Sequence, residues 1–350
     1  KVNGAIMSVR NMGDIAFVIL RKRDGVLQTV YEKGVTDADF AELREETFVE
    51  VSGVLRKEER APRGMELRLK SVRILSKPEE PMPIAVSKWK MSASLEAKLD
   101  MRSLTLRNLR ERARFRIQEG IARAFREYLH GEGFTEIHSP KIGAKGAEGG
   151  ANVFKLDYFH RPAVLAQSPQ FYKQMMVGVF DRVMEVGPVF RAEKHNTKRH
   201  LNEYTGLDFE MGYIDGFEDV MAMETGFLQY TMALLAKDYQ KELDMLGVKL
   251  PDVSRIPAVR FDQAKELVSE KYNRKIRNPS WVSLVLKGQQ YFTVNFFAGN
   301  NPLLKRFNQH PAQRFHFIIF TDNRIHRQCI SLEICINSRS FDNSFYFGSG

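Results

Sequence analysis

The sequence predicts an α+β protein with two domains, a small β-barrel followed by a larger domain of helices and strands. Short segments of alternating apolar residues fill residues 1–76, a proline-rich break follows at residues 76–83, and a long helical pattern begins near residue 109. A chain of 350 residues with 43% hydrophobic residues can bury a core in each domain. Lysine and arginine outnumber acidic residues 53 to 43, and the net charge of +10 favours an anionic partner such as nucleic acid.

The first domain, residues 1–76, is expected to be a barrel of the OB type. Turn signals at residues 11–14 and 24–25 separate its first three strands. The expected order is three strands, a helix and two strands, which is the order of an OB barrel. Another small β-meander is the alternative. The strands are predicted at residues 2–9, 16–21, 26–30, 48–55 and 65–75, and the helical stretch at residues 37–46.

A linker is predicted over residues 77–106, because prolines near its start remove backbone donors and disfavour helix. The second domain should cover residues 107–278 and open with a long amphipathic helix that ends at Gly131 and Gly133. Arginines on its polar face form a solvated surface or contact RNA. The apolar positions that recur near helical spacing are Leu109, Ala113, Ile117, Ile121, Phe125 and Leu129.

Residues 279–350 differ in composition from the rest of the chain. Ten of the 25 phenylalanines lie after residue 280, and we find neither a clear helical face nor well-bounded strands there. This stretch is therefore expected to be an atypical tail. Cys329 and Cys335 have no second pair to complete a four-ligand zinc site, so ordinary thiols are the simpler reading.

The chain begins at Lys1 without a methionine, so we expect its natural start to lie upstream. No apolar run of ~18 residues marks a membrane span, and no charged n-region precedes an apolar segment. A cytoplasmic protein without membrane attachment is therefore expected.

Two segments of the second domain carry recognisable chemistry. Residues 133–142 follow the long helix with a glycine-bounded turn, a short strand and Pro140. In residues 189–204 an arginine and an acid are followed by a polar loop, then by an arginine–histidine pair and by an acid next to an aromatic residue. A strand with alternating apolar residues follows. The second segment closely resembles motif 2 of class II aminoacyl-tRNA synthetases of the aspartyl, asparaginyl and lysyl subclass, and the first resembles their motif 1. Surface charges on an ordinary hairpin are the alternative.

The resemblance implies a class II synthetase antiparallel sheet with flanking helices, ATP as a substrate, tRNA as a partner, and a homodimer formed through motif 1. Carboxylate attack on an α-phosphate concentrates negative charge, which a guanidinium can stabilise. The resemblance implies this catalytic role for Arg191, together with contact to the amino acid. It implies ATP contacts for Arg191, Glu193, Arg199, His200, Leu201 and Tyr204.

Amino-acid selectivity is expected in residues 167–174, where the family offers a glutamine and, three residues later, a lysine. These are Gln170 and Lys173. A substrate carboxylate in a dry pocket needs a buried cation, and an amide substrate cannot replace the lost charge pair. The asparaginyl branch usually lacks this lysine, so Lys173 favours aspartate. Glu148, in a glycine-rich loop, is the candidate for the substrate ammonium, with an ordinary loop as the alternative.

In the barrel, Phe17 and Gln28 lie on the second and third predicted strands. Aspartyl enzymes use a phenylalanine and a glutamine at this spacing to stack on, and hydrogen-bond to, the middle anticodon base. Arg10 would contact the anticodon stem or loop. Phe17 as a core residue is the alternative, because strand alternation decides which side it faces.

The first anticodon base should be read around Met7 and by the loop at residues 59–64. Ala61 and Pro62 in that loop resemble the relaxed branch of the family, which charges both tRNA-Asp and tRNA-Asn. A proline offers no donor for a base edge.

The third motif of the family is not found. No Gly-x-Gly-x-x-Arg-like run follows residue 210, and only three acids follow residue 280, so ligands for Mg²⁺ are not identified. The resemblance covers roughly residues 1–278, and relative to the family the chain is expected to be C-terminally incomplete. The sequence thus predicts an aspartate–tRNA ligase without predicting turnover by this chain. Its rivals are an asparagine–tRNA ligase and a non-catalytic tRNA-binding paralogue.

Overall fold

The structure, a computed structural model, divides by its contacts into two units, Lys1–Arg112 and Ala113–Gly350. The structure describes residues 1–147, 153–194, 201–256, 258, 289–294, 317–322 and 330–336. For the last three of these segments it describes the backbone alone.

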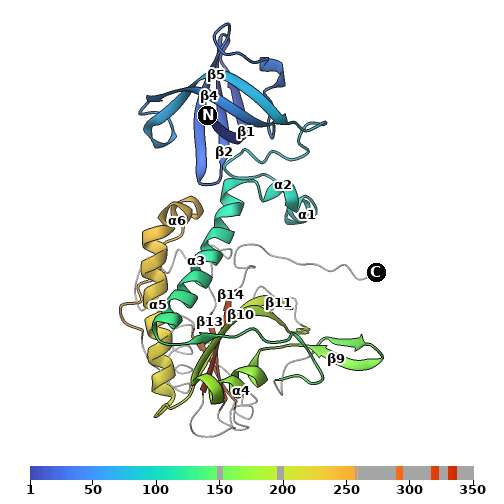
Figure 1. The fold of residues 1–350 in the computed structure, drawn as a ribbon, viewed down its shortest axis with the longest axis vertical. Coiled ribbons are helices and arrows are strands. Elements are labelled where there is room, and N and C mark those ends of the chain that lie inside the picture. Colours follow the sequence, from blue (N-terminus) through green and yellow to red (C-terminus); the bar gives the residue numbers. More distant parts are fainter. Residues whose placement is uncertain are drawn as a thin grey trace, which may run out of the picture. The chain divides into compact units, whose positions relative to one another are not determined.

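The first unit begins with a closed five-stranded barrel (Figure 1). Its strands neighbour one another in the order β1, β2, β3, β5, β4, with β3 and β5 parallel and the other described pairs antiparallel. The predicted OB barrel is confirmed. The strands are β1 (Val2–Asn11), β2 (Ile15–Lys22), β3 (Gly25–Glu32), β4 (Phe48–Lys57) and β5 (Met65–Ser76).

The helix predicted at residues 37–46 is wrong in extent, because only a short 3-10 helix, η1 (Phe40–Glu42), forms there. The backbone before it extends β-like pairing instead: the Asp37 N–H donates to the Lys70 carbonyl at 2.8 Å, and the Val72 N–H donates to the Asp37 carbonyl at 3.1 Å. Glu46, with φ of 64°, ends the segment in a conformation that no helix contains. Backbone pairing to the barrel therefore overrides the local helical preference.

Residues 77–106, which we predict to be a linker, belong to the first unit and contain two short helices, α1 (Leu95–Asp100) and α2 (Arg102–Thr105). The Ser94 hydroxyl accepts a hydrogen bond from the Ala97 N–H at 3.1 Å and so caps α1. A second 3-10 turn, η2 (Pro62–Gly64), precedes β5. The predicted domain boundaries at residues 76, 106 and 278 stay predictions.

The second unit is built on a sheet with the order β14 (Ile330–Ile336), β11, β10, β6, and a smaller sheet has the order β7, β9, β8. This α+β arrangement of an antiparallel hairpin with flanking helices agrees with the predicted fold class. The helices are α3 (Leu109–Gly131), α4 (Gln170–Phe180), α5 (Phe217–Asp238) and α6 (Gln240–Leu246). The strands are β6 (Thr135–Glu136), β7 (Ile142–Gly143), β8 (Lys155–Tyr158), β9 (Arg161–Leu165), β10 (Arg182–Phe190) and β11 (Glu203–Met211).

Helices α3, α5 and α6 contribute to one apolar core with the inner face of β10 and β11 (Figure 1). The Phe125 and Phe227 rings meet edge to face at 5.3 Å. Gly226 lets α3 and α5 approach closely, because a Cβ atom there would lie 1.9 Å from the Tyr128 hydroxyl oxygen. The predicted apolar positions from 113 to 129 along α3 are confirmed as buried.

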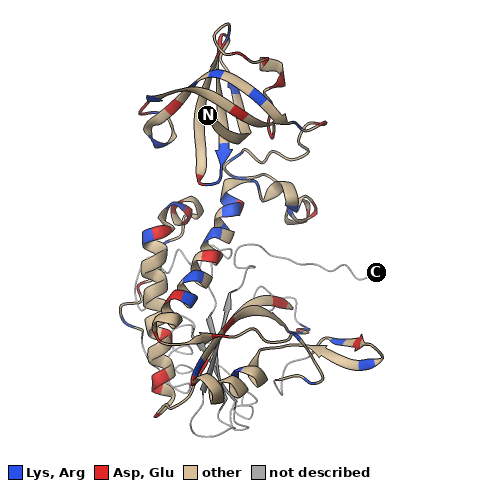
Figure 2. Cartoon of the chain, viewed as in Figure 1, with Lys and Arg blue, Asp and Glu red and all other residues tan. Residues whose placement is uncertain are grey.

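Basic and acidic residues are interspersed along α3 (Figure 2). Arg116 pairs with Glu119 at 2.9 Å, and Arg123 pairs with Glu127 at 2.7 Å. These arginines are held by carboxylates of the protein, which supports a solvated surface over an RNA contact.

The expectation of no well-bounded strands after residue 278 is wrong. Three strands are described there, β12 (Gln289–Val294), β13 (Phe317–Asp322) and β14 (Ile330–Ile336). Strand β14 pairs antiparallel with β11, from Thr205 opposite Ile336 to Met211 opposite Ile330, and extends the main sheet. None of the helices described is both long and apolar enough to cross a membrane.

Candidate functional site

The β10–β11 hairpin has one apolar and one polar face, because side chains alternate along a strand. Met184, Leu207 and Phe209 point into the core and are 0% exposed. On the opposite face the register pairs Glu185 with Asp208, Gly187 with Gly206, and Val189 with Tyr204. The polar residues of motif 2 therefore share one surface.

Arg191 follows β10 directly and is fixed by a hydrogen bond from its N–H to the Asn202 carbonyl at 2.9 Å. Its side chain is buried, and the guanidinium carbon lies 5.9 Å from the centre of the Tyr204 ring. The structure thus brings together two of the residues predicted to bind ATP. A guanidinium held on a rigid strand beside an aromatic ring is suited to binding an anionic group next to a flat base.

Two further residues predicted to contact ATP are described, Glu193 and Leu201. Glu193 is half-buried, and its N–H donates to the Arg191 carbonyl at 2.7 Å. Leu201 is buried. Arg199 and His200, like Glu148 of the glycine-rich loop, lie outside the described residues.

Lys173 reaches the polar face of the hairpin from α4 and is 1% exposed. Its ammonium lies 2.7 Å from Asp208 Oδ1 and 4.0 Å from Glu210 Oε2, and both acids are also buried. Burial raises the pKa of the Asp208 carboxyl above its ordinary value, and the nearby Lys173 ammonium opposes that shift. The predicted buried cation is therefore placed against carboxylates of the protein.

Gln170 is the first residue of α4, half-buried, and its N–H donates to the Ser168 hydroxyl at 3.2 Å. Gln170 and Lys173 are therefore held on the same short helix, as the predicted amino-acid site requires. Their contact with a substrate stays a prediction.

Sequence reasoning missed the acidic partners at this site. Asp208 and Glu210 are acids in an alternating strand, a pattern that could have signalled a buried polar face. Glu185 is a third buried acid; it accepts hydrogen bonds from the Ser139 hydroxyl at 2.6 Å and the Lys141 ammonium at 2.5 Å. Lys141 and Lys173 thus each pair with a buried carboxylate of the hairpin.

The barrel carries the three residues predicted to bind tRNA. Ala16 and Val18 are buried in the barrel core, so Phe17 between them points outward and is half-buried. This places Phe17 outside the barrel core and removes the core-residue alternative. Arg10 lies directly opposite Phe17 in the β1–β2 register and is exposed.

Gln28 lies on β3 and donates from its amide nitrogen to Glu66 Oε2 at 3.0 Å. Glu66 is buried and also lies 2.8 Å from Arg68 Nε. Because the amide nitrogen is bonded to Glu66, the side-chain carbonyl is the group of Gln28 that can accept a hydrogen bond from a base. Sequence reasoning missed Glu66, because the parallel β3–β5 pairing brings it beside Gln28 from 38 residues away.

The described part of the chain contains no cluster of three or more His, Cys, Asp or Glu side chains able to hold a metal ion. Cys329 lies outside the described residues, and only the backbone of Cys335, in β14, is described. The residues described therefore do not form a recognisable Mg²⁺ site.

Comparison with known proteins gives the family. Residues 94–328 match the tRNA synthetases class II (D, K and N), and residues 1–75 match an OB-fold nucleic acid binding domain. The synthetase match runs past residue 278, so the end predicted for the second domain is not settled by it.

The chain is 45% identical over 277 residues to the aspartate–tRNA(Asp/Asn) ligase of Deinococcus radiodurans, covering 79% of this chain and 62% of that protein. It is 38% identical over 276 residues to the aspartate–tRNA(Asp) ligase of Pyrococcus abyssi, covering 77% of this chain and 63% of that protein. The chain thus spans less than two thirds of the length of these relatives.

Among solved structures, the fold is similar to that of asparaginyl-tRNA synthetase from Pyrococcus horikoshii complexed with asparaginyl-adenylate. The TM-score is 0.72 at 24% identity, covering 96% of this chain and 77% of that chain. At that identity the likeness concerns the fold. From the family match and the architecture together, the chain belongs to the class II tRNA synthetases of the D, K and N group.

Proposed function

We propose that the chain carries the anticodon-binding and amino-acid-activating parts of an aspartate–tRNA ligase. The observation that carries the proposal is Lys173, a cation that is 1% exposed on the polar face of the motif 2 hairpin. Asp208 and Glu210 already lie against this ammonium, and a charged substrate carboxylate pairs with a cation more strongly than a neutral amide does.

In the proposed first step, an oxygen of the aspartate α-carboxylate attacks the α-phosphorus of ATP. A new carboxyl–phosphorus bond forms, the bond to the β-phosphate oxygen breaks, and pyrophosphate leaves. Arg191 stabilises the charge that develops on the α-phosphoryl oxygens and holds the two anionic reactants in line. Its buried position beside Tyr204 supports this role, because a rigid donor in a dry site needs little reorganisation.

The remaining substrate contacts follow the family pattern. Glu193 accepts from the adenine amino group, Tyr204 lies against the adenine ring, and Leu201 packs near the nucleotide. Arg199 and His200 bind the phosphates. Glu148 binds the substrate ammonium, and Gln170 binds the amino acid beside Lys173. Class II synthetases use ATP as a substrate and generally depend on Mg²⁺; since the described residues supply no metal cluster, no step is assigned to a metal.

In the second step, a ribose hydroxyl at the end of tRNA attacks the activated carboxyl carbon, and AMP leaves. The barrel selects the tRNA: Phe17 stacks on the middle anticodon base, Gln28 hydrogen-bonds to it, and Arg10 contacts the neighbouring stem or loop. The outward position of Phe17 and the hydrogen bond that holds the Gln28 amide nitrogen to Glu66 support this proposal. We further propose a cytoplasmic homodimer formed through motif 1.

The tRNA specificity is proposed to be relaxed. Relatives at comparable identity include ligases named for both tRNA-Asp and tRNA-Asn and others named for tRNA-Asp alone. Ala61 is buried, Pro62 has no N–H to offer, and Arg63 is held by Asp24 at 2.9 Å. The loop therefore presents few groups that could read the first anticodon base.

Aminoacylation with aspartate of purified tRNA-Asp and tRNA-Asn transcripts tests the proposal. Comparable efficiencies are expected. A preference for tRNA-Asp above about a hundredfold, ~2.7 kcal/mol, would overturn relaxed specificity alone, whereas failure to charge either tRNA would overturn the proposed activity. The second candidate is a non-catalytic tRNA-binding protein, because the third motif of the family is not found in the sequence. Such a protein would bind tRNA without charging it.

A further inference from the structure

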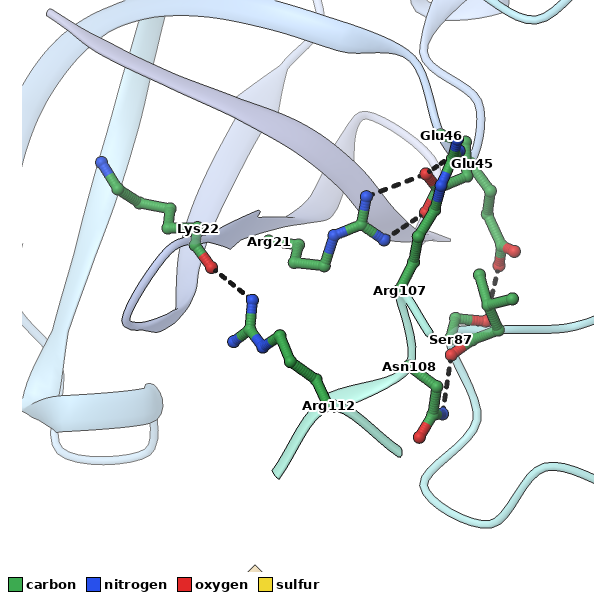
Figure 3. Close-up of polar contacts among 9 residues, drawn as sticks. Arg21, Lys22, Glu45, Glu46, Ser87, Arg107, Asn108 and Arg112 are labelled. Atoms are coloured by element: carbon green, nitrogen blue, oxygen red, sulfur yellow. Dashed lines mark hydrogen bonds and ion pairs between the residues drawn. The ribbon is translucent and has the colours of Figure 1, made fainter. Parts of the chain in front are cut away.

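A buried carboxylate at one end of the barrel joins two segments that are far apart in the sequence. The side chain of Glu46 is 1% exposed and accepts two hydrogen bonds from Arg21, at 2.5 and 2.9 Å. It accepts a third from Arg107 at 2.8 Å, across 61 residues (Figure 3). Arg21 belongs to the barrel, whereas Arg107 lies just before α3.

Further hydrogen bonds, all within the first unit, hold the same region together. Ser87 donates to Glu45 at 2.9 Å, and Arg112 donates to the Lys22 carbonyl at 3.1 Å (Figure 3). Asn108 donates to the carbonyls of Val86 and Lys88, both at 2.8 Å, and its side-chain oxygen accepts from the first N–H groups of α3. Residues 86–88 and 107–112 are therefore attached to one another and to the barrel.

The backbone at Glu46 is unusual as well. Its φ of 64° is a left-handed conformation that glycine would adopt more easily. The Glu46 N–H donates to the Ile6 carbonyl at 2.7 Å, and the Ile6 N–H donates to the Thr47 carbonyl at 2.8 Å. Backbone bonds thus hold a strained residue so that its side chain points to Arg21 and Arg107, and strain of this kind is common at sites with a role beyond folding.

The barrel itself does not need Arg107. The Arg21 side chain is 11% exposed and already neutralises the Glu46 charge with a two-bond pair. Arg107 is 35% exposed, and its bond to Glu46 attaches a residue outside the barrel to the barrel. The Arg107–Glu46 bond is therefore the part of this cluster that acts on how the start of α3 is held, whereas the buried Arg21–Glu46 pair belongs to the barrel.

We propose that Glu46 is a positioning residue for tRNA, which fixes residues 86–112 to the anticodon-reading barrel so that both contribute to one tRNA-binding body. This rests on the proposed function, in which the barrel reads the anticodon. Whole tRNA reaches beyond the barrel, whereas an anticodon stem–loop does not. Loss of the attachment should weaken binding of whole tRNA and leave binding of the anticodon stem–loop unchanged.

The test compares the affinities of the full chain for a tRNA-Asp transcript and for its isolated anticodon stem–loop. We expect Glu46→Gln to weaken whole-tRNA binding at least tenfold and to change stem–loop binding less than twofold. Simple electrostatics predicts the opposite sign, because removing a negative charge should strengthen binding to RNA. Glu50→Gln is the matched control: Glu50 is also on the barrel and pairs with Arg73 and Lys1, which do not hold residues 86–112.

Arg107→Gln tests the same link from the other side and leaves the Arg21–Glu46 pair in place. We expect it to reproduce the effect of Glu46→Gln, and the double variant to be no worse than either single variant. Hydrogen exchange should show faster exchange at residues 107–112 in both variants. In Arg107→Gln, which keeps the Arg21–Glu46 pair, the barrel strands should stay as protected as in the parent.

Unchanged or tighter whole-tRNA binding in both variants would overturn the proposal. Equal weakening of whole tRNA and stem–loop would also overturn it, because that result indicates damage to the barrel. These binding measurements need no catalysis. A parent chain that binds tRNA but charges none would defeat the proposed activity while leaving this test decisive.

Discussion

At the scale of single residues, the site is dominated by buried charge. Lys173 is enclosed with Asp208 and Glu210, and a buried ion pair is costly to break because the remaining charge stays in a medium of low polarity. From the sequence alone, we expect Lys173 to pair with the substrate side chain only. The structure corrects this: Lys173 also neutralises acids of the protein, so its removal affects both binding and stability.

For Lys173→Met we expect aspartate binding to be lost and the unfolding free energy to fall by ~3–5 kcal/mol. The double variant Lys173→Met/Asp208→Asn should recover much of the stability without recovering aspartate binding, because it removes the stranded carboxylate but restores no cation. Calorimetric titration and urea unfolding measure the two quantities. Aspartate affinity within about threefold of the parent in Lys173→Met, a change under ~1 kcal/mol, would contradict the aspartate assignment.

Arg191→Ala should abolish adenylate formation with little change in fold or tRNA binding, since the residue acts on charge that develops during the reaction. The expected loss is ~3 kcal/mol or more of transition-state stabilisation. Arg182→Ala is a suitable control, because Arg182 begins the same strand but contacts Phe134 and the Glu132 carbonyl. Pyrophosphate exchange decides between them, and near-normal exchange in Arg191→Ala would remove Arg191 from its role.

Glu224 on α5 is a buried acid whose Oε1 has no hydrogen-bond partner among the described residues. Burial raises the pKa of Glu224 from 4.5 to about 8. The unfolded chain therefore loses this proton at lower pH than the folded chain. The stability contributed by the neutral form is present below pH ~4.5 and is lost as pH rises through about 8, at ~1.4 kcal/mol per pH unit in between.

Glu224→Gln should flatten this pH dependence and make the protein more stable than the parent at pH 8. Urea unfolding at pH 5, 7 and 8.5 measures it. Glu127→Gln is the control, since Glu127 is an exposed acid whose pKa is lowered, chiefly by its hydrogen bond from Arg123. If Glu224→Gln and the parent lose stability in parallel as pH rises, another group is responsible.

At the scale of elements, alternation explains both functional surfaces. On β2 it buries Ala16 and Val18 and turns Phe17 outward. On the motif 2 hairpin it buries Met184 and Phe209 and gathers the polar residues on the other face. The same local rule thus produces the proposed RNA-binding surface in one unit and a candidate active site in the other.

Phe17→Ala should weaken binding of the anticodon stem–loop by ~1–3 kcal/mol, the usual contribution of one base stacked on an aromatic ring. Its effect on unfolding should be small, because the ring is outside the core. Val18→Ala, one residue along the strand, should do the reverse and lower stability. Fluorescence titration with the stem–loop, together with thermal unfolding, separates the two; equal loss of binding in both variants would show that Phe17 has no special contact.

Sequence periodicity predicted the elements whose pattern is long and local. The barrel strands, α3 and the motif 2 hairpin all follow from such patterns. Periodicity did not predict contacts between distant segments. Lys173 binds Asp208, 35 residues away, and Gln28 binds Glu66, 38 residues away. The prediction of a helix at residues 37–46 was wrong for the same reason, because hydrogen bonds to β5 set the backbone conformation at Asp37.

At the scale of the whole molecule, the sequence predicted the order of the parts, a barrel followed by a synthetase domain, and the family match agrees. It did not predict that residues 77–106 contain helices and belong to the first unit. It also did not predict that β14 joins the main sheet beside β11. Both depend on partners distant in sequence, which composition and spacing do not reveal.

The central claim is that the buried Lys173 site selects aspartate for activation. Amino-acid-dependent pyrophosphate exchange tests it most directly, measured with aspartate and asparagine on this chain and on a version extended to the length of its relatives. We predict exchange with aspartate at least a hundredfold more efficient than with asparagine, ~2.7 kcal/mol. Exchange that is as efficient with asparagine, or no exchange with either amino acid at either length, would contradict the claim.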